Sequence, residues 1–380
     1  MVDTRHVFPV AIALISLMFN CCDAGRLHVQ GTNLVKDGQR VFLSGTNLAW
    51  VHYGYDFGNN QYSGVKTQFE QYLSQIHASG GNSIRVWLHI EGESSPHFTS
   101  QGYVDKTDAA GSLINDMRSF LTSAKHFNVF VFFVLWNGAK KQNTHYRLDG
   151  LIRDSNKLQS YIDHCLKPMV NALKNEPALG GWEIINEPEG ELTPDHHSNN
   201  PCQDTTHLHN SGAGWEGHLY SAAQIQKFVN WQADAIRSTD PGALVTLGVW
   251  NPKSNTDKFG FRNLYSDHCL TSAGGKAHGT LSFYQMHTYT FSGHFDGYSP
   301  FQHHASEFGL NKPLVIGEFR QESGTNPITD MYNYAYYYGY SGAWGWAASD
   351  SNQWSLIKKG MAWLRGRNDQ QKGGLINVHV

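Results

Sequence analysis

The sequence predicts an α/β fold, a single (β/α)8 TIM barrel with long loops after its strands. Eight apolar runs alternate with amphipathic stretches along the 380 residues, an order typical of parallel strands joined by helices. The run at 129–136 is apolar at every position, as expected of a strand covered on both faces. No Gly-x-Gly-x-x-Gly motif or phosphate loop follows the first run, which argues against an open nucleotide-binding sheet. The count of eight therefore favours a closed barrel.

The strands and helices follow one another along the whole chain. A short hairpin with a turn at Lys36-Asp37-Gly38 comes first. The eight strands are expected at 41–50, 83–90, 129–136, 182–186, 243–250, 281–289, 314–318 and 342–347. Apolar residues at helical spacing predict helices at 68–79, 112–127, 156–173, 221–238, 301–308, 328–338 and 354–365. The long stretch 189–217 is expected to be a loop above the ends of the strands.

The first 24 residues are typical of a secretory signal peptide. Arg5 precedes an apolar run at 7–19, and small residues precede Gly25. The run is too short to span a membrane. No linker or change of composition divides residues 25–380, which are predicted to form one catalytic domain. The protein is therefore expected to be secreted and extracellular.

Cysteine usage agrees with export only in part, because three cysteines, an odd number, remain after residue 24. Cys202 and Cys269 lie in polar segments that are expected to be loops, and exported loop thiols usually pair. Cys165 lies in a helical apolar pattern and is expected to be a buried free thiol. A Cys202–Cys269 disulfide is therefore predicted.

Composition limits the classes of partner that the protein is expected to bind. The formal net charge is −3, which gives no sign of a nucleic-acid or polyanion partner. Aromatic residues make up 13% of the chain. They supply a large core and leave flat side chains that can stack on sugar rings.

Two glutamates stand where apolar strands stop. The run Trp182–Ile185 leads into Glu187, and Pro188 prevents the strand from continuing because it has no backbone N–H. A second apolar run ends at Glu318. In a barrel, both carboxylates would meet at the carboxyl-terminal ends of the strands, where active sites lie. Paired carboxylates in such a position are the chemistry of glycoside hydrolysis.

The groups near each glutamate indicate which one is the nucleophile and which one is the acid. Arg85, on the second strand, would keep Glu318 ionised as the nucleophile, and Tyr289 could add a hydrogen bond to it. Glu187 would hold a proton as the acid, because the negative charge of Glu318 raises its pKa. His287 could orient Glu187.

Further side chains at the strand ends suit a sugar. Asn186 could bind the hydroxyl beside the reacting carbon, and Trp346 offers a flat floor under the reacting sugar. Trp87 and Trp344 are expected to pack the barrel. Other tryptophans are possible stacking platforms: Trp50, Trp136, Trp215 and Trp250. The histidines at 196, 197, 207 and 209 lack a fixed ligand spacing, so no metal is predicted.

Together these residues resemble glycoside hydrolase family 5. The resemblance rests on Arg85, Asn186-Glu187-Pro188, His287-x-Tyr289, Gly317-Glu318 and 346–350, in the right strand order. The stretches 45–50, 54–58 and 342–346 look most like the secreted endo-β-1,4-mannanases of that family. One departure is Trp136-Asn137, where many members, cellulases especially, have a histidine. The resemblance implies a retaining double displacement without a cofactor.

The resemblance leaves alternatives open. The substrate is expected to be mannan, glucomannan or galactomannan, but an endo-β-1,4-glucanase of the same family is the second interpretation. A carbohydrate-binding protein without catalysis is the third, and the presence of both glutamates and the arginine argues against it. No nucleic-acid or membrane partner is expected, and the protein is expected to be a monomer.

Overall fold

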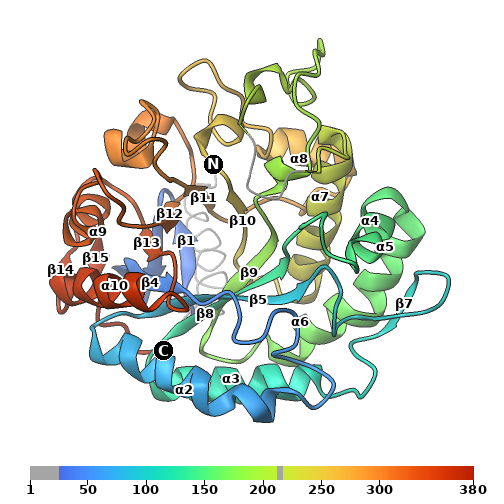
Figure 1. Cartoon of the computed structure of the whole chain (residues 1–380), viewed down its shortest axis with the longest axis horizontal. Coiled ribbons are helices and arrows are strands. Elements are labelled where there is room, and N and C mark those ends of the chain that lie inside the picture. Colours follow the sequence, from blue (N-terminus) through green and yellow to red (C-terminus); the bar gives the residue numbers. More distant parts are fainter. Residues whose placement is uncertain (1–24, 212–216) are drawn as a thin grey trace, which may run out of the picture.

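The eight predicted strands form a closed parallel barrel (Figure 1). The computed structural model describes residues 25–211 and 217–380, so the predicted signal peptide and Trp215 lie outside the described residues. Around the barrel the strands follow chain order, and the last pairs with the first. They are β4 (Leu43–Asn47), β5 (Ser83–Ile90), β8 (Phe130–Trp136), β9 (Leu179–Asn186), β10 (Val245–Val249), β11 (Tyr284–His287), β12 (Leu314–Phe319) and β13 (Gly342–Gly345). The predicted fold class is confirmed.

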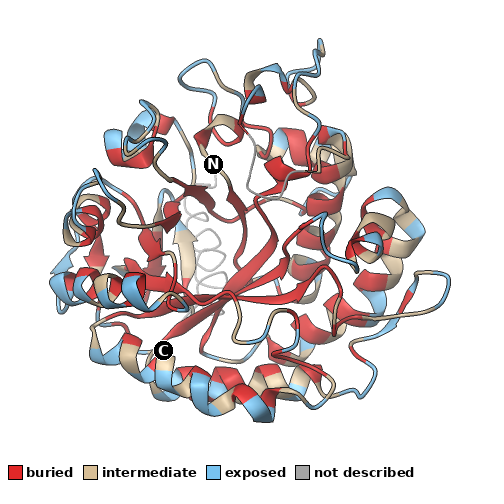
Figure 2. Cartoon of the chain, in the orientation of Figure 1, coloured by how far each residue is buried: buried red, intermediate tan, exposed pale blue. Residues whose placement is uncertain are grey.

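Helices surround the barrel and bury one face against it (Figure 2). They are α2 (Tyr62–Ala78), α3 (Leu113–His126), α4 (His145–Arg153), α5 (Ser155–Tyr161), α6 (Lys167–Leu173), α7 (Ala222–Thr239), α8 (Asp267–Gly274), α9 (Ile328–Tyr337) and α10 (Ser351–Leu364). A π-helical turn, η1 (Ile162–Leu166), joins α5 to α6. Helices α4 and α8 were not expected. The helix expected at 301–308 is two 3-10 turns, η5 (Pro300–Gln302) and η6 (Ala305–Phe308).

Shorter elements complete the described chain. The expected amino-terminal hairpin is a three-stranded sheet of β1 (His28–Gln30), β2 (Asn33–Lys36) and β3 (Gln39–Arg40). The remaining pieces are β6 (His97–Phe98), β7 (Val104–Lys106), β14 (Asn368–Asp369), β15 (Gly374–Leu375), η2 (Pro188–Gly190), η3 (Thr206–Leu208) and η4 (Pro252–Ser254).

Two of the predicted packing tryptophans lie inside the barrel. Trp344 is fully buried, and its Nε1 donates to Ser83 Oγ at 2.9 Å. Trp87 is buried beneath the guanidinium of Arg85, which lies 4.3 Å from the ring centroid. Both therefore pack the barrel interior, as expected.

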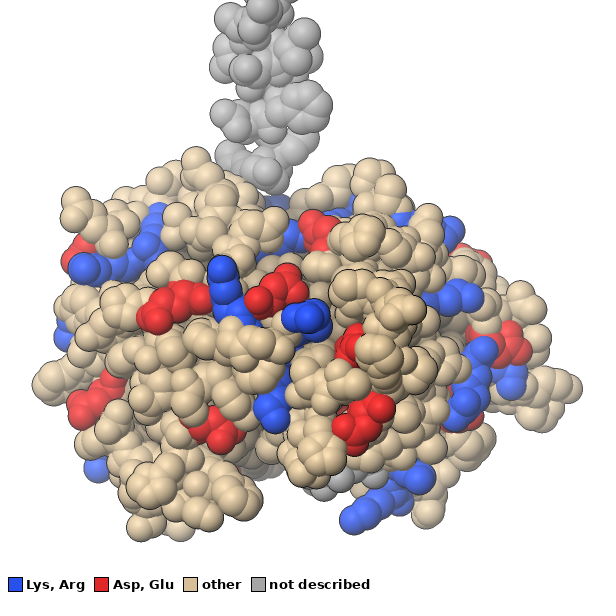
Figure 3. Space-filling model, turned by 90° about the horizontal axis from the view of Figure 1, so that it is seen from above, with Lys and Arg blue, Asp and Glu red and all other residues tan. Residues whose placement is uncertain are grey.

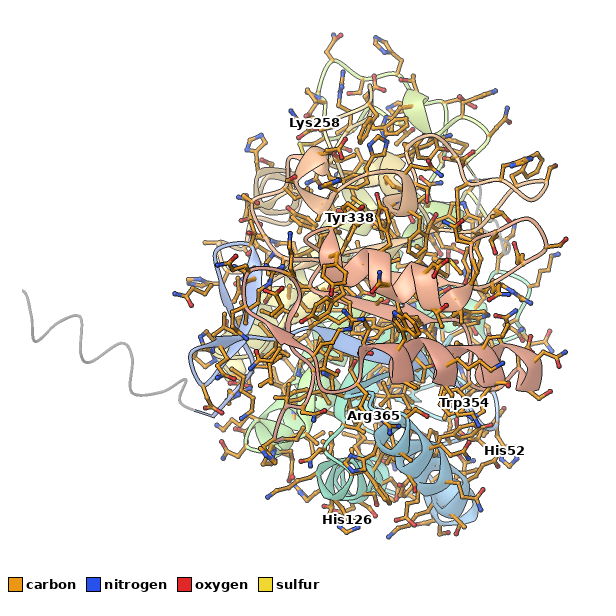
Figure 4. All side chains as sticks on the ribbon, turned by 90° about the vertical axis from the view of Figure 1, so that its left-hand side faces the viewer. His52, His126, Lys258, Tyr338, Trp354 and Arg365 are labelled. Atoms are coloured by element: carbon orange, nitrogen blue, oxygen red, sulfur yellow. A yellow bond between two sulfur atoms is a disulfide. The ribbon has the colours of Figure 1, made fainter. Side chains whose placement is uncertain are left out.

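The outer surface shows no segregation of charge on the face seen in Figure 3, where basic and acidic side chains are interspersed. Figure 4 labels Trp354 near the amino-terminal end of helix α10 and Arg365 just beyond its carboxyl-terminal end. Within the described ranges, no helix has the length and apolar character needed to cross a membrane.

The disulfide joins Cys202 to Cys269, as predicted, and Cys165 is a buried free thiol. The environment of Cys269 differs from the expected loop, because Ser266 caps a short helix, α8, that contains it. The bridge ties the long loop after β9 to the helix between β10 and β11.

Loss of this bridge is expected to lower stability without removing activity. The double substitution Cys202→Ser/Cys269→Ser should lower the free energy of unfolding by about 2–4 kcal/mol, because the unfolded chain regains the freedom of a long loop. Urea unfolding compared with the wild type and with the Cys165→Ala variant measures the change. An unchanged unfolding midpoint in the double variant would contradict the prediction.

Candidate active site

The two predicted glutamates meet at the carboxyl-terminal ends of β9 and β12. Both are almost fully buried, with 1% of Glu187 and 2% of Glu318 exposed. His287, the last residue of β11, lies between them. Its Nδ1 is 2.6 Å from Glu187 Oε1 and 3.6 Å from Glu318 Oε1. One ligand atom from each of the three residues falls within a 4.8 Å group. The barrel therefore brings together three side chains from three strands.

The backbone turns sharply at Glu187. This residue has φ 45° and ψ 56°, in the left-handed region that non-glycine residues rarely adopt. Its N–H donates to the Gly248 carbonyl at 2.7 Å, and Pro188 begins η2 immediately afterwards. Strained conformations of this kind are concentrated at functional sites.

Arg85 is the centre of the buried polar layer. Its Nε and Nη2 donate to the two oxygens of Glu183 at 2.7 and 2.5 Å, and its Nη1 donates to Glu318 Oε1 at 2.5 Å. The remaining donors reach Asn186 Oδ1 at 2.7 Å and Asn47 Oδ1 at 2.9 Å. The predicted Arg85–Glu318 contact is confirmed, and Arg85 holds Asn186 in the same layer.

Glu183 was missed by the sequence analysis. It is fully buried and accepts two hydrogen bonds from Arg85, one on each carboxylate oxygen. Gln285 Nε2 also donates to it at 2.8 Å. A signal was present, because Glu183 is a charged residue within the apolar run Trp182–Ile185, and such a residue must be paired.

A glycine makes room for this layer. A Cβ placed on Gly248 of β10 would lie 2.6 Å from both Arg85 Nη2 and Glu183 Oε1. Any larger residue would therefore push the arginine off its carboxylates.

The two glutamates lie in different environments, which shift their pKa values by different amounts. Burial raises the pKa of Glu187 well above its usual value, and the negative charge of Glu318 raises it further. Burial also raises the pKa of Glu318, but the charge of Arg85 and the hydrogen bond from Tyr289 oppose this. Glu318 is therefore the first of the two to ionise, and Glu187 is the one that keeps a proton.

His287 is neutral in this setting. Burial lowers the pKa of His287 well below its usual value, and the charge of Arg85 lowers it further. Its Nδ1 is bonded to Oε1 of Glu187, whereas Oε2 of Glu187 is buried without a hydrogen-bond partner among the described residues. The predicted contact between His287 and Glu187 is confirmed, and Oε2 is left as the oxygen available to a substrate.

Tyr289 and Trp250 extend the site on the β10–β11 side. The hydroxyl of Tyr289 donates to Glu318 Oε2 at 2.6 Å, as predicted. Its ring stacks on Trp250, with centroids 5.6 Å apart and planes at 22°. Glu189, which was not predicted, accepts a hydrogen bond from the Trp250 backbone N–H at 2.8 Å. Trp250 is therefore held in place and only partly buried.

Trp50 and Trp346 lie together on the opposite side. Both are partly buried and pack edge-on against Trp87, at 6.3 and 5.7 Å between centroids. Each therefore keeps some surface free at the strand ends.

The prediction that Trp136 is a stacking platform is wrong. Its side chain is fully buried between barrel and helices, with Tyr161 5.0 Å away between ring centroids and Gln232 accepting from its Nε1 at 3.1 Å. Phe132 and Val134 belong to interior clusters, whereas Trp136 joins the outer core. Side chains along β8 therefore alternate between the barrel interior and the outer core, except at its last residue, where Trp136 points outward.

Asn137 takes the inward place instead. Its Oδ1 accepts from Trp87 Nε1 at 3.2 Å, and its Nδ2 donates at 3.0 Å to the buried Glu91. The Oδ1 of Asn137 also accepts from Asn186 Nδ2 at 3.4 Å. Asn137 and Glu91 therefore form a second polar group beside the site that the sequence analysis did not identify.

Among the described residues, the only set with geometry for a metal is Glu187, His287 and Glu318. His287 is already hydrogen-bonded to Glu187, and Glu318 to Arg85, whose positive charge opposes a cation. Two of the four loop histidines have carboxylate partners instead: His197 pairs with Asp204 and His209 with Asp195.

Comparison with known proteins agrees with this geometry. The family model described as cellulase (glycosyl hydrolase family 5) matches residues 36–353. The chain belongs to glycoside hydrolase family 5. It is 58% identical over 360 residues to a mannan endo-1,4-beta-mannosidase of Mytilus edulis, covering 94% of this chain and 97% of the relative. A relative with the same name from Cryptopygus antarcticus is 45% identical, with 93% and 94% covered.

Solved structures of the family superimpose closely. The beta-mannanase of the blue mussel Mytilus edulis is 57% identical with a TM-score of 0.90, over 93% of this chain and 99% of that one. The beta-1,4-mannanase of the sea hare Aplysia kurodai is 50% identical with the same TM-score of 0.90, over 93% and 100%. The family-5 barrel thus extends over nearly all of this chain.

The coupling of the two glutamates should be visible in a titration. In a Glu318→Gln variant the pKa of Glu187 should fall, because the negative charge that raised it is gone. Carbon NMR of labelled glutamate carboxyls in wild type and variant measures the shift. A Glu307→Gln variant, altered at an exposed position, is the control. An unchanged pKa of Glu187 in Glu318→Gln would contradict the coupling.

Proposed function

We propose that this family-5 enzyme is a retaining endo-β-1,4-mannanase that cuts internal bonds of mannan, glucomannan or galactomannan. One observation carries the retaining mechanism: the carboxylates of Glu187 and Glu318 have oxygens within a 4.8 Å group. Retaining enzymes place their two carboxyl groups about 5–5.5 Å apart, whereas inverting enzymes leave a wider gap for water. The names of the close relatives support the choice of mannan.

In the first step Glu318 is the nucleophile. Its ionised oxygen attacks the anomeric carbon, while Glu187 gives its proton to the glycosidic oxygen of the departing chain. The free Oε2 of Glu187 is the oxygen suited to this transfer. Arg85 and Tyr289 hold Glu318 in position and stabilise its charge before the attack.

In the second step Glu187 acts as a base. Having lost its proton, it accepts one from a water molecule, which attacks the same carbon and releases Glu318. Two inversions return the β configuration. Asn186 uses its Oδ1 to accept from Arg85, so its Nδ2 is the donor available to the neighbouring sugar hydroxyl.

The enzyme is further proposed to be secreted after removal of residues 1–24, and to act as a monomer without a cofactor. The apolar segment at 7–19 and the disulfide support export.

The deciding experiment compares substrates. Release of reducing ends should be much faster from mannan than from a soluble cellulose derivative, and the reverse order would favour the glucanase. The first product seen by proton NMR should have the β configuration. An α product would exclude the retaining mechanism.

Trp346 and Trp250 are expected to contact sugars at different positions along the substrate chain. Trp346→Ala should mainly lower kcat, because Trp346 lies next to the strand that carries Glu318. Trp250→Ala should mainly raise KM and change product lengths, because contacts remote from the cut supply binding energy. Kinetics on mannan oligomers of increasing length measure both effects. Equal and small effects would show that neither ring touches sugar.

A further inference from the structure

A cavity of about 390 Å³ lies at the end of the barrel away from the glutamates. Thr32, Asn33 and Arg40 of the amino-terminal segment line one side, and Leu314 lines another. Leu314 begins β12, whereas Glu318 lies four residues further along the same strand, which corresponds to about 13 Å. The volume is within the range of sites that bind small molecules.

The ionisable side chains that line the cavity, apart from tyrosines, are all basic. The titratable side chains that face the cavity, apart from two tyrosines, are Arg40, His304, Lys312 and Lys372. None of the described residues that line it is an aspartate or a glutamate. Lys312 is paired with Asp267, which is not part of the lining. The side chain of Lys372 has no hydrogen bond or ion pair in the described part of the chain. The cavity therefore favours an anion.

Arg40 is held in place with donors to spare. Its backbone N–H donates to Gln370 Oε1 at 2.7 Å. Its Nη2 reaches only the Gly339 carbonyl, at 3.5 Å, and its Nε is buried with no hydrogen-bond partner in the described chain. Leaving a buried donor unpaired costs about 1–3 kcal/mol. Because Nε is shielded, the terminal nitrogens of the guanidinium, of which Nη2 has only this long contact, are the donors left for a carboxylate or a sulfate.

Aromatic rings form another part of the wall. Tyr337 and Tyr338, at the end of α9, both line the cavity and are partly exposed, and Figure 4 labels Tyr338 near the middle of its view. The Tyr338 ring stacks on Tyr334, with centroids 4.1 Å apart, and packs against His304 at 4.4 Å. Fixed flat rings beside hydrogen-bond donors suit a sugar ring.

We propose that this cavity is a second binding site, for a saccharide unit that carries an anionic group, either the carboxylate of a uronic acid or a sulfate ester. Arg40 and Lys372 bind the anionic group, and Tyr337 and Tyr338 contact the ring. The site would hold the enzyme on acidic polysaccharide while the distant glutamates cut neutral chains. The formal net charge of −3 does not reveal it, because that number sums the charges of the whole chain.

Calorimetry with the full enzyme tests the proposal. The probes are a galacturonic acid trisaccharide, a sulfated galactose disaccharide, the neutral galactose trisaccharide and inorganic sulfate. The acidic saccharides should bind, and Arg40→Ala and Lys372→Ala should each weaken that binding about tenfold, equivalent to about 1.4 kcal/mol. The tighter of the two acidic probes identifies the anionic group. Lys359→Ala, which removes the same charge from an exposed position on α10, should leave binding unchanged.

Three results would overturn the proposal. Equal weakening by Lys372→Ala and Lys359→Ala would show diffuse attraction without a site. Equal binding of the neutral trisaccharide would remove the role of the anion. Equal binding of inorganic sulfate would remove the role of the sugar. Hydrolysis of mannohexaose should be the same in all variants, so the test is separate from that of the proposed activity.

Discussion

Replacing Glu318 by alanine is expected to lower kcat on mannan by on the order of 10⁴-fold or more, because the substitution removes the carboxylate that forms the covalent intermediate. The fold should persist, since the substitution removes one of two carboxylates that share Arg85 and leaves Glu183 paired. Initial rates of reducing-end release, together with circular dichroism, measure the two effects.

Rescue of the alanine variants by azide distinguishes the roles of the two glutamates, because each variant should give a different anomer of the mannosyl azide. With Glu318→Ala and an activated mannoside, azide takes the place of the nucleophile and should give the α-mannosyl azide. With Glu187→Ala, azide should instead attack the covalent intermediate from the other face and give the β-mannosyl azide. The opposite pairing of variant and product would show that the roles are reversed.

Replacing Arg85 by methionine is expected to abolish activity and to destabilise the fold. The substitution leaves Glu183 and Glu318 buried without their counter-charge, which should cost about 3–5 kcal/mol in the free energy of unfolding. Unfolding in urea and residual activity on mannan are the measurements. The matched control is Arg153→Met, whose ion pair with Asp149 is on the surface and should contribute less than about 1 kcal/mol.

A double substitution distinguishes stability from catalysis. Arg85→Met/Glu183→Gln removes one of the stranded charges, so part of the lost stability should return. Activity should stay low, because Glu318 still lacks its positive neighbour. Full recovery of activity in the double variant would show that Arg85 acts on the fold alone.

The strand order and the two glutamates could be predicted because both depend on local sequence. Apolar runs of five to eight residues reveal buried parallel strands, and Pro188 marks where β9 must stop. The carboxyl ends of parallel strands meet in one place, so Glu187 and Glu318 could be brought together without coordinates. The same reasoning placed Arg85, His287 and Tyr289 correctly.

Other features depend on contacts between distant segments. The outward turn of Trp136 follows from the end of β8 and from its packing on Tyr161, neither of which its own run of apolar residues reveals. Helix α8 begins at a serine cap within a polar stretch, where hydrophobic periodicity gives little signal.

The sequence by itself therefore determined the barrel and the strand-end carboxylates, because both follow from local pattern and chain order. Only the tertiary structure decided that Arg85 divides its donors between Glu318 and the buried Glu183. Arg85 and Glu183 are 98 residues apart, so no local pattern joins them. The protonation of Glu187 arises from burial and from charges that the closed barrel brings within a few ångströms, where low dielectric makes each of them strong.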